Sequence, residues 1–501
     1  MGHLRPIAHD TCLPLHDAAA TRRIETEALA GRPEDELIQQ AGLSVAKLAM
    51  AIAPHGSRIW VACGPGNNGA DGLEAARQLQ SWGKTVFVTN LAWGTSDGNV
   101  KRHRLQRAVD AGVVWLSTPP DEFDLCIDAM LGLGSQTRPA DARLREWIGG
   151  IRAHRKPVLS IDLPTGLNPD TGWTGEDVVA ADHTLSLLTL KPGMFTGGGR
   201  DVCGCVWLDD LGVAPTLLAT PNAPPPTAWL SGAPDPAVRP HASHKGSYGD
   251  VCVVGGAQGM TGAALMAASA ALHAGAGRVF VSLLNHGAPL AHLGLLELML
   301  RPFESLAIKD MAVVCGCGGG TQIAACLPEL FTAARALVVD ADGLNAMAAD
   351  PKLGLLLRQR GDRGGPTVMT PHPLEAARLL GTSVDSIQRD RLHAAKELSQ
   401  NFNCTVVLKG SGTVISSPSE VPLINPTGNG RLASPGTGDV LAGMIGAGLA
   451  LGHGAARASA EAVFRHGQIA DQWPRGWALT ASRLSETGLA ELSTPGSPAA
   501  L

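Results

Sequence analysis

The sequence predicts an α/β protein with two domains, each built on a mainly parallel sheet. Short β-branched runs alternate with Ala- and Leu-rich stretches from residue 57 onward, a pattern typical of consecutive βαβ units. The chain has 501 residues, whereas one domain usually holds roughly 100–200. Proline is dense between residues 216 and 240, and the alternation restarts after that break. We therefore expect a first domain at residues 1–216, a Pro-rich linker at 217–235 and a second domain at 236–501.

The alternation also locates the individual strands. In the first half, the expected strands are RIWVACG, TVFVTN, FDLCIDAM and KPVLSID, with a helix at DGLEAARQLQSWG. In the second half they are DVCVVGG, RVFVSLL, MAVVCG, ALVVDADG, PTVMTPHP and TVVLKGSG, each followed by a helical run. After about Trp473 we expect a final helix and a disordered end.

Composition excludes several classes of protein. The formal net charge is -5 and the charges are mixed along the chain, so there is no basic stripe that would bind nucleic acid. Several of the ten cysteines lie in apolar runs, as buried, reduced thiols do in cytosolic proteins. The first residues lack the apolar core of a secretory signal, and His273 and Arg278 interrupt the longest apolar stretch. We expect a cytoplasmic protein that binds neither nucleic acid nor membrane.

A glycine-rich segment, GPGNNGADG at residues 64–72, follows the first predicted strand and opens a helix. Such a segment lets an anion approach unpaired backbone N–H groups, although a plain tight turn is also consistent with it. The side-chain amides of Asn67 and Asn68 can bind a ligand or supply oxygen to a cation. Asp128 and Asp162 end two other strands, and parallel strands end at one edge, so Asn68 and both aspartates are expected to converge. The alternative is that each aspartate caps the turn after its strand.

These motifs resemble a known family. GPGNNGADG, DAMLGLG and SIDLPTGLNPDTG, with ELIQQAGLSVAKLA at residues 36–49, are similar to the NAD(P)H-hydrate epimerases over residues 15–215. The resemblance implies a Rossmann-like, doubly wound domain that interconverts the two C6 epimers of hydrated NADH or NADPH. It assigns Asp162 to proton transfer and a potassium ion to Asn68, Asp128 and Thr165. It implies that the hydrated cofactor is bound by Asn67, Asn68, Gly69, Ala70, Asp71, Gly132, Leu133, Gly134, Arg138 and Asp162, where Ala70 replaces the family's glycine.

A second glycine turn, PGTGD at residues 435–439, precedes an apolar helical run. The N–H groups of its glycines and the helix dipole would attract a phosphate. A carboxylate beside an anion is unfavourable for stability alone, so Asp439 is predicted to accept the proton of an attacking hydroxyl in phosphoryl transfer. The alternative is that Asp439 is a simple helix cap.

The surrounding motifs resemble the ribokinase-like NAD(P)H-hydrate dehydratases over residues 240–454. They are HKGSYGDVCVVGGAQGMTGAALMAASAALHAGAG, VVDADGLNAM, VMTPHPLEAARLLG, VVLKGSGTVI and NPTGNGRLASPGTGDVLAG. The resemblance implies that ADP or ATP, with Mg²⁺, phosphorylates the hydroxyl of the hydrate, and that phosphate then leaves. It implies that the hydrated cofactor faces Ala263, Gly318, His372 and Asp439, with Asp439 as the base. It implies that the nucleotide is bound by Lys409, Gly410, Ser411, Gly412, Thr413 and Gly438.

Some residues of this half admit two interpretations. The sequence CGCGGG stands where the family commonly has Gly-Pro-Gly, and Pro435 replaces a glycine of the turn, which removes one N–H. Cys315 and Cys317 lack a second ligand pair with zinc spacing. His241 and His244 are expected in a loop near the nucleotide rather than on a metal. Asp340 and Asp342 are either catalytic or structural caps.

We therefore predict a bifunctional enzyme for nicotinamide cofactor repair, expected to form a homo-oligomer. One alternative is a ribokinase-like kinase of a small molecule such as a vitamin precursor. The other is that the first domain is a non-catalytic cofactor-binding or oligomerisation module.

Overall fold

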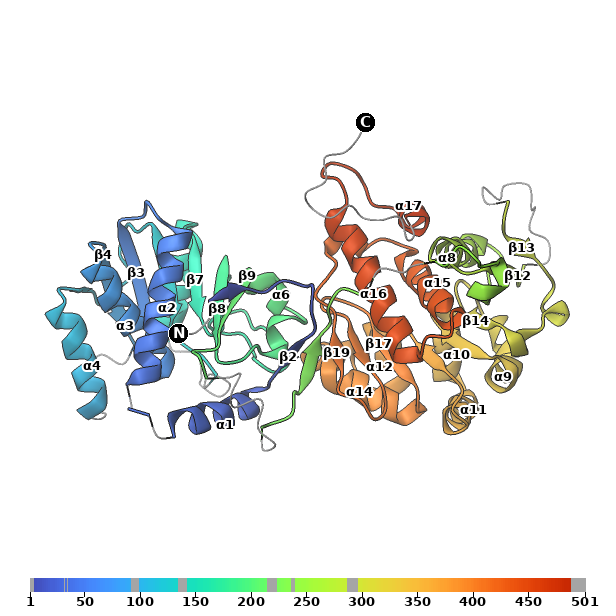
Figure 1. The fold of residues 1–501 in the computed structure, drawn as a ribbon, viewed down its shortest axis with the longest axis horizontal. Coiled ribbons are helices and arrows are strands. Elements are labelled where there is room, and N and C mark those ends of the chain that lie inside the picture. The colour runs from blue at the N-terminus through green and yellow to red at the C-terminus, as the bar shows by residue number, and fades with distance from the viewer. Residues whose placement is uncertain are drawn as a thin grey trace. The chain divides into compact units, whose positions relative to one another are not determined.

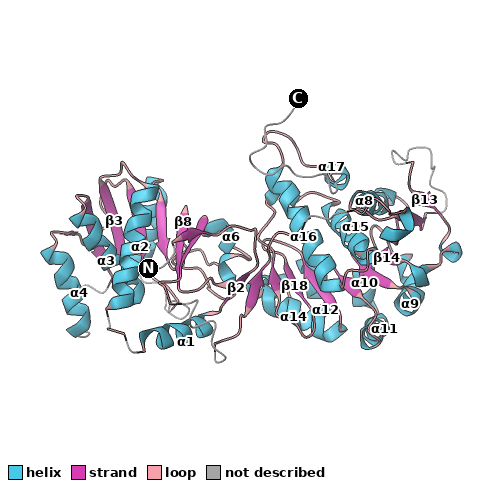
Figure 2. Ribbon diagram, in the orientation of Figure 1, coloured by secondary structure: helices cyan, strands magenta, loops and turns pink. Residues whose placement is uncertain are grey.

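The computed structural model describes residues 4–30, 32, 33, 35–91, 99–133, 142–213, 223–235, 239–285 and 296–487. The chain divides into two compact units, one comprising Met1–Ala8 and Leu13–Leu230 and the other His9–Cys12 and Ser231–Leu501. Both units combine strands with covering helices (Figures 1 and 2). The predicted linker at 217–235 lies partly outside the described residues.

The first unit contains a twisted sheet with the strand order β1-β9-β8-β7-β6-β3-β4-β5. Neighbouring strands from β9 to β5 are parallel, and β1 joins the edge antiparallel to β9. Its strands are β1 (Arg5–Pro6), β2 (Leu13–Leu15), β3 (Arg58–Cys63), β4 (Thr85–Asn90), β5 (Val114–Trp115), β6 (Leu125–Ala129), β7 (Val158–Ile161), β8 (His183–Leu187), β9 (Cys205–Asp209) and β10 (Ala228–Leu230). Its helices are α1 (Ala18–Leu29), α2 (Glu36–Ile52), α3 (Asn67–Ser81), α4 (Asn99–Asp110), α5 (Ala142–His154) and α6 (Gly199–Val202).

Side chains of the central strands alternate between two apolar clusters, one on each face of this sheet. Ile59 and Val61 of β3 belong to a cluster that includes residues of α2 and α3. Trp60 and Ala62 belong to a second cluster with Trp147 of α5. Because both faces are covered, these strands are apolar along their whole length, which is why the sequence marks them so clearly.

The second unit contains a sheet with the order β13-β12-β11-β14-β15-β16-β17-β18-β19, parallel as far as β17 and antiparallel beyond it. Its strands are β11 (Asp250–Gly255), β12 (Arg278–Leu283), β13 (Met299–Leu300), β14 (Ala312–Cys315), β15 (Ala336–Val339), β16 (Thr367–Met369), β17 (Thr405–Leu408), β18 (Val414–Ser416) and β19 (Leu423–Ile424). Its helices are α8 (Thr261–His273), α9 (Ile323–Ala333), α10 (Asp342–Ala349), α11 (Pro351–Asp362), α12 (Pro373–Leu380), α13 (Val384–Arg389), α14 (Arg391–Phe402), α15 (Thr437–Ala450), α16 (Ala455–Gln472) and α17 (Ala481–Glu486).

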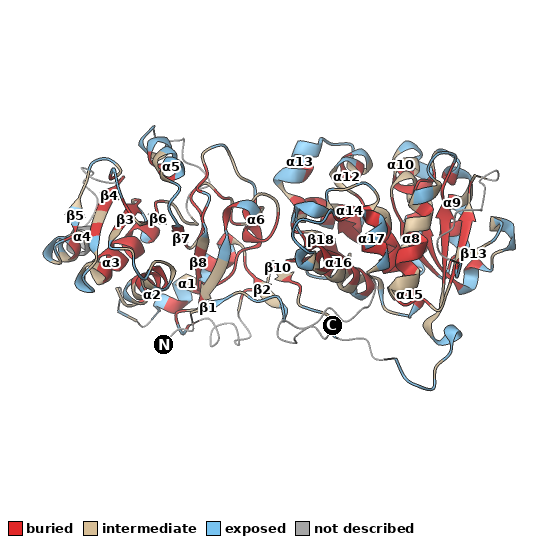
Figure 3. Cartoon of the chain, turned by 90° about the horizontal axis from the view of Figure 1, so that it is seen from above, coloured by how far each residue is buried: buried red, intermediate tan, exposed pale blue. Residues whose placement is uncertain are grey.

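This sheet also separates two apolar clusters. Val251 and Val253 of β11 face a cluster that includes residues of α8, α15 and α16, whereas Cys252 and Val254 face one that includes residues of α9, α11 and α14. Figure 3 shows the buried residues concentrated in the strands and on the helix faces turned toward them. The predicted α/β class with parallel sheets is confirmed in both units.

The expected strands all correspond to strands of the structure, but some details differ. β8 and β9 were not expected, because polar residues, three in HTLSL and one in CVWLD, weaken the apolar signal of these strands. Asn67 and Asn68 lie in the first turn of α3 rather than in a loop before it. Helix α17 lies after Trp473, and the end of the chain from residue 488 is outside the described part. No helix in the described part of the chain combines the length and apolar character needed to cross a membrane.

Close contact between α3 and β6 fixes the position of the first turn of α3. A Cβ atom at Gly72 would lie 2.5 Å from Ala129 Cβ, whereas one at Gly149 of α5 would meet nothing within 4 Å. Gly72→Ala should lower the free energy of unfolding by about 1–3 kcal/mol through overpacking. The matched control Gly149→Ala should raise it by about 0.5–1 kcal/mol through helix propensity. Urea unfolding of the full chain, followed by tryptophan fluorescence, measures both, and equal effects of the two variants would contradict the packing.

Candidate functional site

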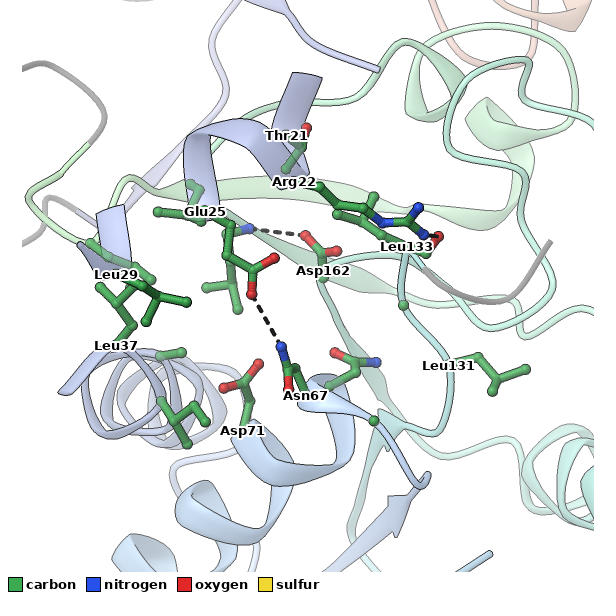
Figure 4. A pocket seen from close by; sticks show the side chains of 18 of the residues that line it. Thr21, Arg22, Glu25, Leu29, Leu37, Asn67, Asp71, Leu131, Leu133 and Asp162 are labelled. Atoms are coloured by element: carbon green, nitrogen blue, oxygen red, sulfur yellow. Dashed lines mark hydrogen bonds between the residues drawn. The ribbon is translucent and has the colours of Figure 1, made fainter. Parts of the chain in front are cut away.

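A cavity of about 450 Å³ opens at the carboxyl ends of β3, β6 and β7 in the first unit. Figure 4 shows Glu25, Asn67 and Asp162 around the same space. The wall is apolar on the side formed by leucines of α1, α2 and the segment after β8, and polar on the side of α3. Lining residues are Thr21, Arg22, Glu25, Leu29, Leu37, Ile38, Ala41, Pro65, Gly66, Asn67, Asn68, Asp71, Met130, Leu131, Gly132, Leu133, Asp162, Leu187, Leu188 and Leu211.

The first turn of α3 brings two amides to this cavity. Asn67 Nδ2 donates a hydrogen bond to Glu25 Oε1 (3.1 Å). Asn68 is buried, and neither its Oδ1 nor its Nδ2 has a hydrogen-bond partner among the described residues. An unsatisfied buried polar group costs about 1–3 kcal/mol, so the amide of Asn68 is available to a ligand in this cavity.

Asp128 is a buried carboxylate on β6 that is surrounded by hydroxyl and N–H donors. The register of β6 with β7 places Asp128 opposite Ser160, whose Oγ donates to Oδ2 (2.9 Å). Thr165 donates through its N–H to Oδ2 (2.9 Å) and through Oγ1 to Oδ1 (2.7 Å). Burial raises the pKa of Asp128, and no Lys or Arg among the described residues forms an ion pair with it. A buried carboxylate of this kind favours a bound cation.

Asp162 follows β7 directly and occupies a strained backbone conformation. Its φ is +64°, and Leu163 N–H donates to Ile161 O (2.7 Å) across it, which closes a γ-turn. Its Oδ1 accepts hydrogen bonds from the ammonium of Lys191 and from Leu187 N–H (3.4 Å). The turn therefore aims a carboxylate into the cavity while a fully buried lysine holds one of its oxygens.

The structure brings most of the residues expected in the first unit together. Asn67, Asn68, Asp71, Gly132, Leu133 and Asp162 line the cavity, and Asp128 contacts Thr165 next to Leu131. Gly69 and Ala70 lie within α3 and are not part of the lining. A helical position accepts alanine without strain, so Ala70 is compatible with the site. Gly134 and Arg138 lie outside the described residues.

Sequence reasoning missed three polar residues of this site: Lys191, Ser160 and Glu25. Lys191 left a signal, because a lysine within the apolar run TLSLLTLKPGMF is buried only when it is paired. Glu25 left none, because one carboxylate on an amphipathic helix resembles any solvent-facing residue.

The second site lies at the carboxyl ends of β14, β15, β16 and β17. Strand register brings Cys317, Asp340, Thr370 and Lys409 to one edge of the sheet. Lys409 Nζ donates to Asp340 Oδ1 (2.7 Å), as does Thr370 Oγ1 (2.7 Å). Burial opposes the charge of Lys409, but the carboxylates of Asp340 and Glu375 outweigh it and raise its pKa. This edge therefore holds a largely buried cation next to a buried carboxylate.

Helix α15 begins at the same edge with Asp439 in its first turn. Gly436, the N-cap, has φ +90°, and a Cβ at Gly438 would lie 3.2 Å from Lys409 Nζ. Burial and the charge of Asp340 raise the pKa of Asp439 to about 6, although the thiol of Cys317 and Lys409 favour its ionised form. The ligand atoms of Cys317, Asp340 and Asp439 lie within 4.8 Å of one another. Asp439 is thus not the cap of its helix and is tuned toward proton exchange near neutral pH.

His372 is the N-cap of α12. Its Nδ1 accepts hydrogen bonds from the N–H groups of Leu374 (3.1 Å) and Glu375 (3.3 Å). Burial, and then the charge of Lys409, lower the pKa of His372, whereas burial raises that of Glu375 to about 7. The ring is therefore neutral with its proton on Nε2, which lies 3.3 Å from Glu375 Oε1.

The other residues expected here form two sets, those expected to face the hydrated cofactor and those expected to bind the nucleotide. Ala263 packs against Gly318, since a Cβ at Gly318 would lie 2.9 Å from Ala263 Cβ. The segment Lys409–Thr413, which includes Gly410, Ser411 and Gly412, follows β17. It forms a turn in which Thr413 Oγ1 donates a hydrogen bond to Gly410 O (3.1 Å).

Asp342 accepts a hydrogen bond from Gly320 N–H (2.8 Å). This contact is the structural cap that the sequence analysis gave as one of two interpretations of Asp342. Cys315 belongs to the cluster on the opposite face from Cys317, so the two thiols do not form a pair.

Two buried residues that the sequence did not single out hold the backbone of this site. Arg391 donates to the carbonyls of Leu408 (3.1 Å) and Lys409 (3.1 Å). His466 lies with Nε2 2.9 Å from the carbonyl of Thr437, and burial lowers its pKa to about 4. Both fix elements far from them in sequence, which no local pattern reveals.

Comparisons with known proteins agree with this division. Residues 251–488 match the model of the NAD(P)H-hydrate dehydratase family, and residues 34–193 match that of the YjeF-related protein N-terminus. An ADP-dependent (S)-NAD(P)H-hydrate dehydratase of Neisseria meningitidis is 40% identical over 240 residues, 46% of this chain and 80% of that protein. The crystal structure of an ADP/ATP-dependent NAD(P)H-hydrate dehydratase from Bacillus subtilis, co-crystallised with ATP/Mg²⁺, is 32% identical with a TM-score of 0.43 and covers 50% of this chain and 90% of that one.

Similarity to a relative with both parts extends over nearly the whole chain. The bifunctional NAD(P)H-hydrate repair enzyme of Escherichia coli is 35% identical over 475 residues, which cover 90% of this chain and 88% of the relative. A relative from Coxiella burnetii with the same description is 33% identical over 479 residues, 91% of this chain and 94% of the relative. The chain therefore belongs to the family of bifunctional NAD(P)H-hydrate repair enzymes.

Proposed function

We propose that the chain repairs hydrated NADH and NADPH in two steps. The first unit equilibrates the C6 epimers, and the second dehydrates the S epimer at the expense of ADP or ATP. The observation that carries this proposal is Asp439, a carboxylate whose pKa burial raises to about 6, in the first turn of a helix with a glycine-rich start. A negative charge there weakens anion binding, so its presence favours a role in proton transfer.

In the dehydration step, Asp439 accepts the proton of the substrate hydroxyl while the hydroxyl oxygen attacks the terminal phosphorus of the nucleotide. The bond from that phosphorus to the rest of the nucleotide breaks, and the N–H groups of Gly436 and Gly438 and the ammonium of Lys409 stabilise the transferred charge. Phosphate then leaves C6 with the electrons of the C–O bond, and the released phosphate accepts the proton that C5 loses as the ring double bond forms. Hydroxide is a poor leaving group and phosphate a good one, which explains the use of a nucleotide. Magnesium enters as the counter-ion of the nucleotide phosphates.

In the epimerisation step, Asp162 exchanges the proton of the C6 hydroxyl. C6 carries both this hydroxyl and the ring nitrogen, so removal of the proton lets the C–N bond open, with its electron pair on nitrogen and a carbonyl at C6. Closure on the other face of the carbonyl returns the proton and gives the second epimer. The leucines that line the cavity, among them Leu37 and Leu188, exclude water and hold the ring against Asp162.

A potassium ion fits the residues beside this cavity. Asn68 offers a buried, unpartnered amide oxygen, and Asp128 a buried carboxylate without an ion pair among the described residues. Thr165, hydrogen-bonded to Asp128, adds a hydroxyl oxygen. We infer that these oxygens hold the ion, which would supply positive charge to an anionic part of the substrate.

A single assay with two variants tests the division of labour. Wild-type protein with Mg²⁺ and ADP or ATP should convert an epimeric mixture completely to NADH, followed by its absorbance. Asp162→Asn should convert the S fraction at the normal rate and the remainder slowly, because the epimers no longer equilibrate. Asp439→Asn should slow dehydration by about 100-fold or more while the epimers still equilibrate and nucleotide still binds.

Two results would contradict this scheme. A stable phosphorylated product without NADH would favour a small-molecule kinase. Complete, single-phase conversion by Asp162→Asn would favour a non-catalytic first unit.

The pH dependence of dehydration should reflect Asp439. A base must be ionised, so kcat/KM should be constant above the pKa of about 6 and fall tenfold per pH unit below it. Cys317→Ala removes the thiol hydrogen bond that favours the ionised carboxylate of Asp439. In this variant the fall of kcat/KM should therefore begin at a higher pH than in the wild type. The profile is measured as the rate of dehydration of the pure S epimer between pH 4.5 and 8. An ordinary aspartate titrates at about 3.9, so a fall of kcat/KM that begins only near pH 4 would refute the assignment.

Epimerisation should require potassium through Asn68. In a choline buffer, added K⁺ should accelerate equilibration of the epimers more than Na⁺ does. Asn68→Ala should raise the K⁺ concentration for half-maximal rate by about tenfold or more, because one ligand is lost. Asn67→Ala, the neighbouring amide bonded to Glu25, should leave that concentration within about threefold, or roughly 0.7 kcal/mol. Equal rates in Na⁺ and K⁺ would exclude the ion.

A further inference from the structure

Lys191 is a fully buried lysine whose ammonium uses all its donors. It lies after β8 in the first unit and is 0% exposed. Its Nζ donates to Asp162 Oδ1, to Ser186 Oγ (3.1 Å) and to Leu187 O (3.0 Å). A buried ammonium costs several kcal/mol unless an opposite charge compensates it, and Asp162 is the carboxylate that does so. The pair is therefore a costly arrangement that packing alone does not require.

The lysine also joins two strained turns. Asp162 has φ +64° and Leu188 has φ +62°, and each is the central residue of a γ-turn. In the first turn, Leu163 N–H donates a hydrogen bond to Ile161 O (2.7 Å). In the second, Thr189 N–H donates a hydrogen bond to Leu187 O (2.7 Å). Each such residue costs about 1–3 kcal/mol and persists where its surroundings hold it. Lys191 contacts the carboxylate of the first turn and the carbonyl that begins the second.

This arrangement orients the carboxylate. Every hydrogen bond that the described residues make to Asp162's side chain falls on Oδ1, from Lys191 and from Leu187 N–H. The side chain lines the cavity. Oδ2 is consequently the oxygen available to a bound substrate.

We propose that Lys191 is a positioning residue for epimerisation, which fixes the carboxylate of Asp162 by one oxygen so that the other oxygen meets the substrate hydroxyl as the base. This role rests on the proposed epimerase function. Loss of the ammonium should leave the carboxylate free to rotate, and a misplacement of about 1 Å can cost about 100-fold in rate.

Other charged groups near the pair do not replace this effect. Arg22 of α1 donates to the carbonyl of Leu133 (2.8 Å), and Glu25 and Asp71, which also line the cavity, are acidic residues and not cations. Burial lowers the pKa of His16, which lies near Lys191, so this ring is neutral at neutral pH. Among the described residues, Lys191 is the cation paired with Asp162.

The test is the separation of kcat from KM for epimerisation in the full chain. Lys191→Met removes the ammonium with little change in volume, and should lower kcat by about tenfold or more while KM stays within about threefold, because the base loses its orientation and the cavity keeps its lining. Ser186→Ala removes another acceptor of Lys191 and keeps the ammonium on Asp162, so its kcat should stay within about threefold of wild type, or roughly 0.7 kcal/mol. Lys191→Arg also keeps a cation and should recover most of the kcat that Lys191→Met loses. Equilibration of the purified epimers, followed by chromatography at several substrate concentrations, supplies the rates.

The outcomes separate the proposal from the function on which it rests. A Lys191→Met protein with the wild-type kcat, or one in which kcat and KM both change and Lys191→Arg restores neither, would overturn the role, because a purely structural lysine disturbs the whole cavity. If that variant fails to fold, Lys191→Gln is measured in its place under the same criterion. Dehydration of the pure S epimer in the same samples reports the amount of intact second unit. Wild-type protein that does not equilibrate the epimers would overturn the epimerase function and this role together.

Discussion

Pairing of a buried ammonium with a strand-end aspartate is the interaction on which both sites depend. In the first unit Lys191 contacts Asp162 after β7, and in the second Lys409 contacts Asp340 after β15. A buried carboxylate without a compensating cation costs several kcal/mol. The lysines therefore offset the burial of these two carboxylates at an edge that apolar residues surround.

The two units differ in which carboxylate receives the lysine. Lys191 contacts the proposed base itself, whereas Lys409 contacts a neighbour of Asp439, and the pKa of Asp439 stays raised to about 6. A base with a raised pKa is the stronger proton acceptor, which suits an attack on phosphorus. In epimerisation the proposed base Asp162 only exchanges the proton of a hydroxyl while the ring opens and closes, so an oriented carboxylate is sufficient.

Backbone conformation supplies the rest of the geometry. The γ-turns at Asp162 and Leu188 and the left-handed Gly436 each place a functional group where a regular strand or helix could not. Buried side chains hold these segments: Lys191 in the first unit, and Arg391 and His466 in the second. The strain of the turns is offset by the hydrogen bonds of residues that do not themselves meet the substrate.

The amino-acid sequence was enough to predict the α/β class, the strands that are buried on both faces, and the glycine-rich starts of α3 and α15, because apolar periodicity and glycine are local signals. It also predicted that Asn68, Asp128 and Asp162 lie close together, because strand ends of a parallel sheet meet at one edge, and that Asp439 lies in a glycine-rich turn. It could not show that Lys191 holds Asp162, that Asn68 has no partner among the described residues, or that Asp342 caps a loop. These facts depend on strand register and on turns with positive φ at Asp162 and Leu188, where burial and long-range hydrogen bonds override the local preferences that a sequence expresses.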